Sequence, residues 1–264
     1  MTVVLTGLTE RQRQSWLGLL DVAADFPDGW CLVGGQMVHL YCQERRLSPS
    51  RPTNDGDVVL DARAQPNVLG DFTGSLASVG FTSAGVSTDG HQHRWVRDKA
   101  TIDVLIPQSL GRTAASRKGV TGGTTLATPG AQQAISRSEP VSVQVDDRVG
   151  TIRRPNMLGA LVAKAAAFSI PSDPGKERHL TDFATLAATA RGAVQIGEQL
   201  RARDRHYLIP MLTALDDSRR LWASIDGAER GVVALAAITA TKSKRTVSAP
   251  QSPTAAPEPP APDL

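Results

Sequence analysis

Two carboxylates separated by one residue form the strongest chemical signal in the sequence. Asp55 and Asp57 lie in the segment Thr-Asn-Asp-Gly-Asp-Val-Val-Leu at residues 53–60, and residues 57–60 predict a short strand. Residues i and i+2 of an extended chain point to the same face, so the two carboxylates would converge. Mg²⁺ favours a few such carboxylates, with waters and substrate phosphates completing its shell. The pair therefore predicts a Mg²⁺ (or Mn²⁺) site, and an exposed Asp-Gly-Asp turn is the alternative.

A third carboxylate, Asp103, stands in the apolar segment Ala-Thr-Ile-Asp-Val-Leu-Ile at residues 100–106, which predicts a strand. Burying an unpaired charge in such a strand is costly, so Asp103 needs a metal, a cation or a position at the strand end. On a strand beside Asp55 and Asp57 it would complete a two-metal site, which activates an attacking oxygen and neutralises a leaving group. Pairing with a nearby arginine is the alternative.

Gly34 and Gly35 follow the apolar run Trp-Cys-Leu-Val at residues 30–33, and a helical pattern of apolar residues comes after them. Glycine permits a sharp turn and lets a phosphate approach the backbone closely. The following helix would direct its unpaired N–H groups toward that phosphate. The pair predicts a phosphate-binding turn, unless it is only a turn.

Three charged residues in the second half could contact a nucleotide. Lys164 lies in an apolar helix predicted over residues 156–168, and Arg178 and Asp182 lie near the start of a helix predicted over 177–190. Lys164 could contact phosphates as a point charge, or extend along the surface to solvent. Asp182 could orient an attacking hydroxyl or Lys164, or serve only as a helix-start charge. Arg178 could add a phosphate contact or lie in a solvated loop.

The pattern of apolar residues predicts an α/β (α+β) fold in two parts, which must position these side chains. Up to about residue 150, short strands alternate with helices, and Thr9 predicts the start of the first helix. From Pro155 onward the apolar residues recur at helical spacing only, with further helices over about 194–203, 206–223 and 229–240. We therefore expect a core with a mixed sheet and flanking helices over 1–150 and a helical lobe over 151–240. Residues 241–264 hold six of the 17 prolines, and we expect this tail to be disordered.

The composition limits the cellular context. Of the 264 residues, 41% are hydrophobic, which permits a buried core. The formal charge of +3 permits a nucleic-acid partner without requiring one. The two cysteines, Cys31 and Cys42, lie in apolar patterns and are expected in the core. Charged residues near the N-terminus argue against a signal peptide, and no apolar run has the length of a membrane span. These features predict a cytoplasmic protein with no membrane partner.

The combination of motifs resembles a known group. A strand, Gly-Gly and a helix, then Asp-x-Asp, then an aspartate on a later strand resemble the signature of the nucleotidyltransferase superfamily. Lys164, the segment His-Leu-Thr-Asp-Phe-Ala-Thr-Leu at residues 179–186 and Leu-Val-Gly-Gly-Gln-Met-Val-His-Leu at 32–40 are similar to the AbiEii/MenT-type nucleotidyltransferase toxins over residues 28–190. The chain departs from the pattern in a long connection, which indicates an inserted loop near residues 45–52, and in Gly56, where the family has an apolar residue.

The resemblance implies an activity and a set of sites. It implies transfer of a nucleoside monophosphate from an NTP to an acceptor hydroxyl, with RNA, and in particular the tRNA 3′ end, as acceptor. It further implies a toxin of a toxin–antitoxin or phage-defence system, with a cognate antitoxin protein as partner. By this resemblance the metal pair falls on Asp55 and Asp57, the functional lysine on Lys164 and the aspartate of the second domain on Asp182. Together with the motifs above, we expect Asp103 as a third metal ligand. The expected nucleotide contacts are Gly34, Gly35, Thr53, Lys164 and Arg178. Transfer to a small molecule such as an aminoglycoside, or nucleotide binding without catalysis, are the alternatives.

Overall fold

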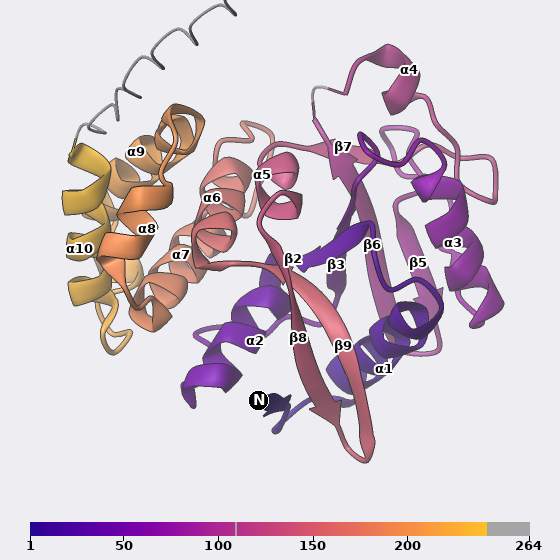
Figure 1. The fold of residues 1–264 in the computed structure, drawn as a ribbon, viewed down its shortest axis with the longest axis horizontal. Coiled ribbons are helices and arrows are strands. Elements are labelled where there is room, and N and C mark those ends of the chain that lie inside the picture. Colours follow the sequence, from indigo (N-terminus) through magenta and orange to yellow (C-terminus); the bar gives the residue numbers. More distant parts are fainter. Residues whose placement is uncertain (109, 242–264) are drawn as a thin grey trace, which may run out of the picture.

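The computed structural model describes residues 1–108 and 110–241, so the Pro-rich tail that the sequence predicts to be disordered lies outside the described residues from position 242 onward. Within the described part, strands and helices alternate up to β9, and helices alone follow (Figure 1). This arrangement confirms the predicted mixed α/β fold with a helical C-terminal part.

A mixed six-stranded sheet forms the centre of the first part. Its strands run in the order β2 (Trp30–Val33), β3 (Gly56–Leu60), β6 (Ala100–Pro107), β5 (Arg94–Arg97) and β4 (Thr82–Ser83), and β7 (Leu126–Thr128) also pairs with β6. β3 is parallel to β6, whereas β2 and β5 are antiparallel to their neighbours. Because Asp57 and Asp103 are direct partners in the parallel register, the topology places the two predicted acidic strands side by side.

A smaller three-stranded sheet is built from distant parts of the chain. β1 (Thr2–Val4) runs parallel to β8 (Ser138–Val145), and β9 (Arg148–Pro155) closes the hairpin with β8. The helix α1 (Glu10–Asp25) packs against both β9 and β6 and so connects the two sheets. Thr9 caps α1 as the sequence predicts, because its side chain accepts a hydrogen bond from the backbone N–H of Gln12.

Four further helices belong to this first part. They are α2 (Gly34–Arg45), α3 (Val68–Ser78), and the short α4 (Arg112–Ala115) and α5 (Ala131–Ile135). The sequence predicts α2 and α3 but not α4 or α5, since elements of one turn carry too few residues for a periodic pattern.

The helical part consists of α6 (Met157–Phe168), α7 (Glu177–Thr189), α8 (Ala193–Gln199), α9 (Ala202–Asp217), the 3₁₀ turn η1 (Arg219–Leu221) and α10 (Ala228–Ala240). The predicted break between residues 203 and 206 is wrong, because α9 runs through both positions. The chain breaks instead at Leu200 and Arg201, where the Asp204 carboxylate accepts a hydrogen bond from the Arg201 N–H at 2.9 Å and begins α9.

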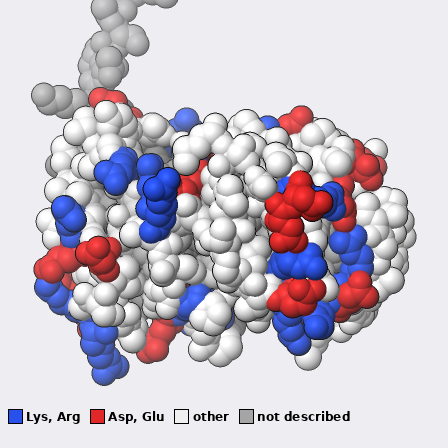
Figure 2. Space-filling model, turned by 90° about the horizontal axis from the view of Figure 1, so that it is seen from below, with Lys and Arg blue, Asp and Glu red and all other residues white. Residues whose placement is uncertain are grey.

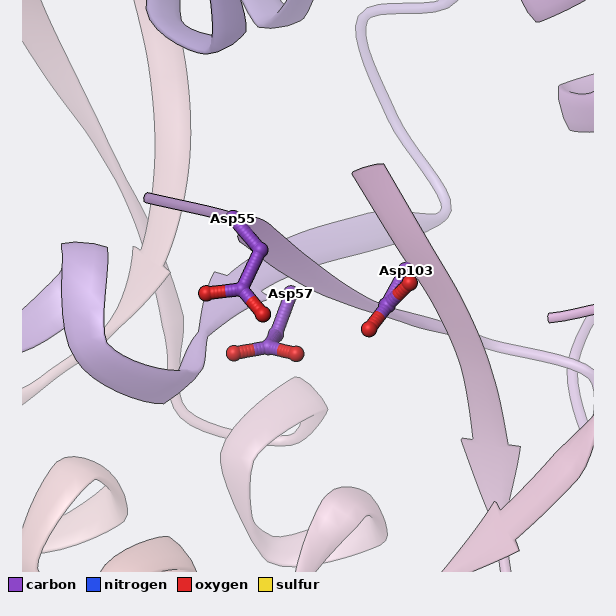
Figure 3. A group of neighbouring side chains, drawn as sticks. All are labelled: Asp55, Asp57 and Asp103. Atoms are coloured by element: carbon purple, nitrogen blue, oxygen red, sulfur yellow. The ribbon is translucent and has the colours of Figure 1, made fainter. Parts of the chain in front are cut away.

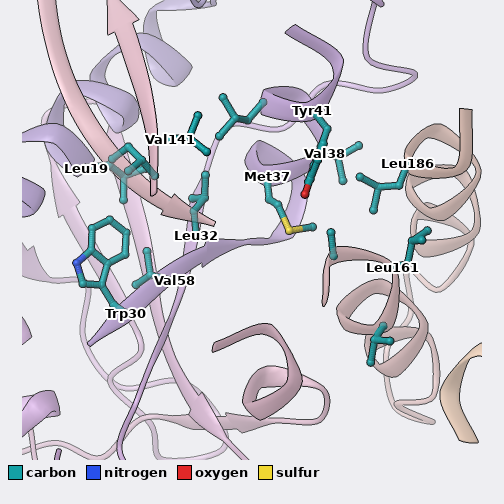
Figure 4. Close-up of a cluster of buried hydrophobic side chains, with 14 of the residues drawn as sticks. Leu19, Trp30, Leu32, Met37, Val38, Tyr41, Val58, Val141, Leu161 and Leu186 are labelled. Atoms are coloured by element: carbon teal, nitrogen blue, oxygen red, sulfur yellow. The ribbon is translucent and has the colours of Figure 1, made fainter. Parts of the chain in front are cut away.

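One main hydrophobic core joins the two parts. It includes Trp30 and Val58 from the sheet, Met37 from α2, and Leu161 and Leu186 from α6 and α7 (Figure 4). α2 packs against α7. Both cysteines are fully buried, as the sequence predicts. β9 crosses residue 150, where the sequence places the domain boundary, and no described helix is long and apolar enough to cross a membrane.

Candidate active site

A cleft of about 860 Å³ lies between the sheet and the helices α6 and α7. Eight of the nine residues that the sequence selects line it, namely Gly34, Gly35, Thr53, Asp55, Asp57, Asp103, Lys164 and Arg178. Asp182 does not line the cleft, because its carboxylate is buried behind Lys164. Residues that are far apart in the sequence therefore meet around one space.

The three aspartates form one cluster in the lining of this cleft. Asp57 on β3 and Asp103 on β6 are register partners, and Asp55 directly precedes β3. One carboxylate oxygen from each lies within 4.8 Å of the others, so the three could share a metal ion. Figure 3 shows the side chains directed into the same space from the two strands.

The electrostatics of the cluster favour a cation. Burial, followed by repulsion from Asp55 and Asp103, raises the pKa of Asp57 to about 7. A positive charge added nearby would lower this pKa and favour the ionised carboxylate. Oxygen-only ligands at this spacing suit Mg²⁺ or Mn²⁺, so the residues present fit a divalent ion.

Gly34 and Gly35 make room for the carboxylates. Gly34 has a φ of 68°, and a Cβ at this position would lie 1.7 Å from the Asp57 Oδ2 atom. A Cβ on Gly35 would lie 2.5 Å from the Thr53 hydroxyl oxygen. The turn also begins α2, which has no side-chain cap at its N-terminus and whose first two residues line the cleft. Both glycines are therefore required by packing, and they place the start of α2 beside the aspartates.

Thr53 positions Asp55, and α1 positions Thr53. The buried Thr53 hydroxyl donates to Asp55 Oδ1 at 3.1 Å, while the Thr53 carbonyl accepts from Gln12 Nε2 at 2.7 Å. Ser15 donates to the carbonyl of Asn54 at 3.0 Å. Neither Gln12 nor Ser15 is predicted from the sequence. The available signal is their helical spacing with Trp16 and Leu19, which places all four on one face of α1.

Gly56 does not disturb the strand that carries the acidic pair. It is buried in β3 and paired with Ile102, and a Cβ there would approach Leu19 to 3.2 Å. The glycine that departs from the family pattern therefore fits under α1 without loss of strand pairing.

Lys164 and Asp182 form a buried ion pair with a third member, Arg51. Asp182 Oδ2 lies 2.7 Å from Lys164 Nζ, and Arg51 donates to both Asp182 oxygens at 2.8 and 2.7 Å. Burial alone would raise the pKa of Asp182, but Lys164 and Arg51 lower it below its ordinary value. Sequence reasoning placed Arg51 in an inserted loop and missed it. Its position shortly before Thr53 and Asp55 was the only signal.

A second acidic residue shapes the loop before α7. The Asp173 carboxylate accepts hydrogen bonds from the Gly175 N–H, from Arg178 and from the imidazole of His179, each at 2.8 Å. Burial, followed by the charge of Lys164, lowers the pKa of His179 to about 4, so the imidazole is neutral at pH ~7. Arg178 is 47% exposed and lines the cleft, which leaves it accessible to a ligand.

Arg94 is the cation closest to the aspartate cluster among the described ion pairs. Its Nε and Nη2 atoms donate to the two oxygens of Asp103 at 2.8 and 2.7 Å, and Nη2 lies 3.7 Å from Asp55 Oδ2. The hydrogen bonds to Asp103 raise the pKa of Arg94 further above its ordinary range, so the guanidinium is always charged. The alternative raised for Asp103, an arginine partner, is therefore present in the structure.

Comparison with known proteins places the fold. The sequence matches no protein-family model and no curated protein. The structure is similar to a crystal structure of an antigenic nucleotidyltransferase-like protein from Paracoccidioides brasiliensis, with a TM-score of 0.51 and 14% identity over 81% of this chain and 93% of that chain. The chain therefore has a nucleotidyltransferase-like fold.

A second solved structure, the solution structure of the antibiotic-resistance factor ANT(2'')-Ia, has a TM-score of 0.42 and 12% identity. The similarity covers 81% of this chain and 99% of that chain. At these identities the likenesses concern the fold alone.

Proposed function

We propose that the protein is a nucleotidyltransferase that moves a nucleoside monophosphate from an NTP to an acceptor hydroxyl and releases pyrophosphate. One observation carries this proposal: three carboxylates converge beside a Gly-Gly helix start in a cleft of about 860 Å³. Phosphoryl-type transfer depends mainly on positioning and charge neutralisation, and this residue set can supply both.

Each residue of the cleft has a role in this proposal. Asp55 and Asp57 hold Mg²⁺ or Mn²⁺, with Asp103 completing the acidic cluster, and the ion neutralises phosphate charge when bound. The N–H groups at Gly34 and Gly35 bind phosphate oxygens. Lys164 of α6 adds a positive charge to the cleft lining and is held in place by Asp182, and the half-exposed Arg178 contacts the phosphates. Thr53 orients Asp55.

The apolar part of the cleft lining suits the base and ribose of the nucleotide. It includes the small and aliphatic side chains of Leu105, Leu126, Ala131, Ala163 and Ala167. These side chains can bury the apolar faces of a base, and none of them can form a hydrogen bond with it. We therefore expect this part of the lining to accept a base by shape and dispersion contacts.

We infer RNA, and in particular the tRNA 3′ end, as the acceptor, and a toxin role that a cognate antitoxin protein would neutralise. The motifs shared with the AbiEii/MenT-type toxins support this, as do the exposed Arg11 and Arg178 at the cleft. On the face seen in Figure 2, basic and acidic side chains are interspersed, so this face offers no continuous basic surface for an RNA backbone. We therefore propose that the RNA contacts the protein at the cleft, near Arg11 and Arg178.

Labelled nucleotides test the proposal. The purified protein is incubated with Mg²⁺ and each α-labelled NTP in turn, with total RNA or an aminoglycoside as acceptor. We expect label on RNA with one or more NTPs, and none with the Asp57→Asn variant. Asp71→Asn, an exposed aspartate of α3, is the matched control and keeps the activity. Label on the aminoglycoside would show that the acceptor is a small molecule. Absence of transfer to either acceptor would contradict the proposed catalysis.

A further inference from the structure

Arg94 is held rigidly against the aspartate cluster by strand pairing. It lies on β5 directly opposite Asp103 on β6, and its two hydrogen bonds engage both Asp103 oxygens at 2.8 and 2.7 Å. A two-point arginine–carboxylate contact of this kind is strong and fixes the orientation of both groups. The same Nη2 atom is 3.7 Å from Asp55 Oδ2, so the guanidinium borders the space between the carboxylates.

The pairing changes what Asp103 can offer a metal. Both oxygens of Asp103 accept hydrogen bonds from Arg94, so this carboxylate is less available to an ion. Asp55 is more available, because it accepts a hydrogen bond from the Thr53 hydroxyl and lies 3.7 Å from Arg94 Nη2. The three carboxylates and the guanidinium together carry a net charge that a single divalent ion neutralises.

The other cations near the cleft have different partners. Lys164 and Arg51 bind Asp182, and Arg178 binds Asp173. Among the ion pairs of the described residues, Arg94 alone joins a basic side chain to this aspartate cluster.

We propose that Arg94 takes the place of a second metal ion, so that the site holds one divalent ion, bound by Asp55 and Asp57. This inference rests on the proposed function and specifies the composition of its metal site. An arginine is always protonated, whereas a second Mg²⁺ must be recruited from solution. Arg94 therefore supplies a positive charge beside the reacting phosphates at any Mg²⁺ concentration.

Counting bound Mn²⁺ by electron paramagnetic resonance tests this without an activity assay. We expect one Mn²⁺ per wild-type chain and a second one in Arg94→Gln, where Asp103 is released. Arg148→Gln is the matched control, because Arg148 is 45% exposed and pairs with the carboxylate of Asp21 outside the cleft. It keeps one Mn²⁺. Two ions in the wild type, or only one in Arg94→Gln, overturns the inference.

A second variant covers the case in which Arg94→Gln does not fold. Asp103→Asn should retain one Mn²⁺ with an affinity within about tenfold of the wild type, whereas Asp57→Asn should lose more than that. Equal losses in both variants would make Asp103 a ligand and contradict the inference. If the wild type and Asp57→Asn bind no Mn²⁺ at all, the proposed metal site itself fails, and this result is distinct from the binding of two ions.

Discussion

Gly34 is the residue whose replacement tests the cleft most directly. Its φ of 68° is unfavourable for other residues, and a Cβ would lie 1.7 Å from the Asp57 carboxylate. Gly34→Ala should therefore displace Asp57 and abolish both Mn²⁺ binding and nucleotidyl transfer. Gly74→Ala is the control, since a Cβ there meets nothing within 4 Å, and it should change stability by no more than about 1 kcal/mol. Normal Mn²⁺ binding by Gly34→Ala would show that the metal site does not depend on the conformation of this turn.

The buried imidazole of His179 predicts a specific dependence of stability on pH. Its pKa is about 4 in the folded protein against an ordinary 6.5, so the unfolded chain binds the additional proton between these values. The free energy of unfolding should therefore fall as the pH drops from ~6.5 to ~4. This residue accounts for roughly 2–3 kcal/mol of that loss over the whole window, and for about 2 kcal/mol between pH ~7 and pH ~5.

Urea titrations of the wild type and of His179→Gln at about pH 7 and about pH 5 measure that contribution. The difference between the two pH values should shrink in His179→Gln and stay unchanged in His206→Gln, an exposed histidine of α9. An identical loss in all three proteins would show that other groups cause it.

At the residue scale, the sequence is informative where chemistry follows from local spacing. The convergence of Asp55 and Asp57 follows from strand alternation, and the apolar setting of Asp103 indicates a required partner. Arg51 and Arg94 could not be predicted in the same way, because their partners depend on which segments the fold brings together. Twenty-nine lysines and arginines are equivalent candidates until that is known.

At the scale of elements, Asp182 connects three segments. It lies on α7 and pairs with Lys164 of α6 and with Arg51 of the loop before β3, and it is only 2% exposed. Removing one member of a buried ionic cluster leaves uncompensated charge and typically costs about 3–5 kcal/mol. Asp182→Ala should lower the free energy of unfolding by that amount.

Chemical denaturation measures this loss. The control Asp217→Ala, at an exposed position near the end of α9, should change the free energy of unfolding by less than about 0.5 kcal/mol. If Asp182→Ala loses as little stability as Asp217→Ala, the ionic cluster contributes little to holding α7 against the loop.

Capped helices and short apolar strands such as β2 and β3 could be predicted, whereas the one-turn helices, β1 and the start of α9 could not. Thr9 and Asn156 cap α1 and α6 through their side chains, and both helices carry apolar residues at helical spacing. β1 is three residues long and depends on β8, more than a hundred residues later, so no local pattern reveals it. The start of α9 was missed for a related reason, because Asp204 is held there by a buried pair with Arg137 outside the helical part.

At the scale of the whole molecule, the sequence predicts the change from mixed α/β to helical structure, but it does not show how the two parts meet. Their contact combines apolar packing of α2 against α7 with the two hydrogen bonds from Arg51, in the loop before β3, to the Asp182 carboxylate on α7. We propose that the parts over residues 1–150 and 151–240 act as two lobes around the cleft, with Lys164 facing the aspartates from the second lobe.

The continuity of the core predicts that both lobes unfold together. Trp16, Trp30 and Trp95 are buried in the first part, Trp222 is buried in the helical part, and the main core cluster contains all four. Separating the lobes would expose apolar surface on α2, α6 and α7, which is unfavourable in water. Two-state behaviour is therefore expected for the described chain despite its two-part architecture. Tryptophan fluorescence of Trp222→Phe reports the first part, while far-UV circular dichroism weights the helices, so the two urea midpoints should coincide. Separate midpoints would show that the helical lobe unfolds by itself, and that the shared core contributes less than its packing indicates.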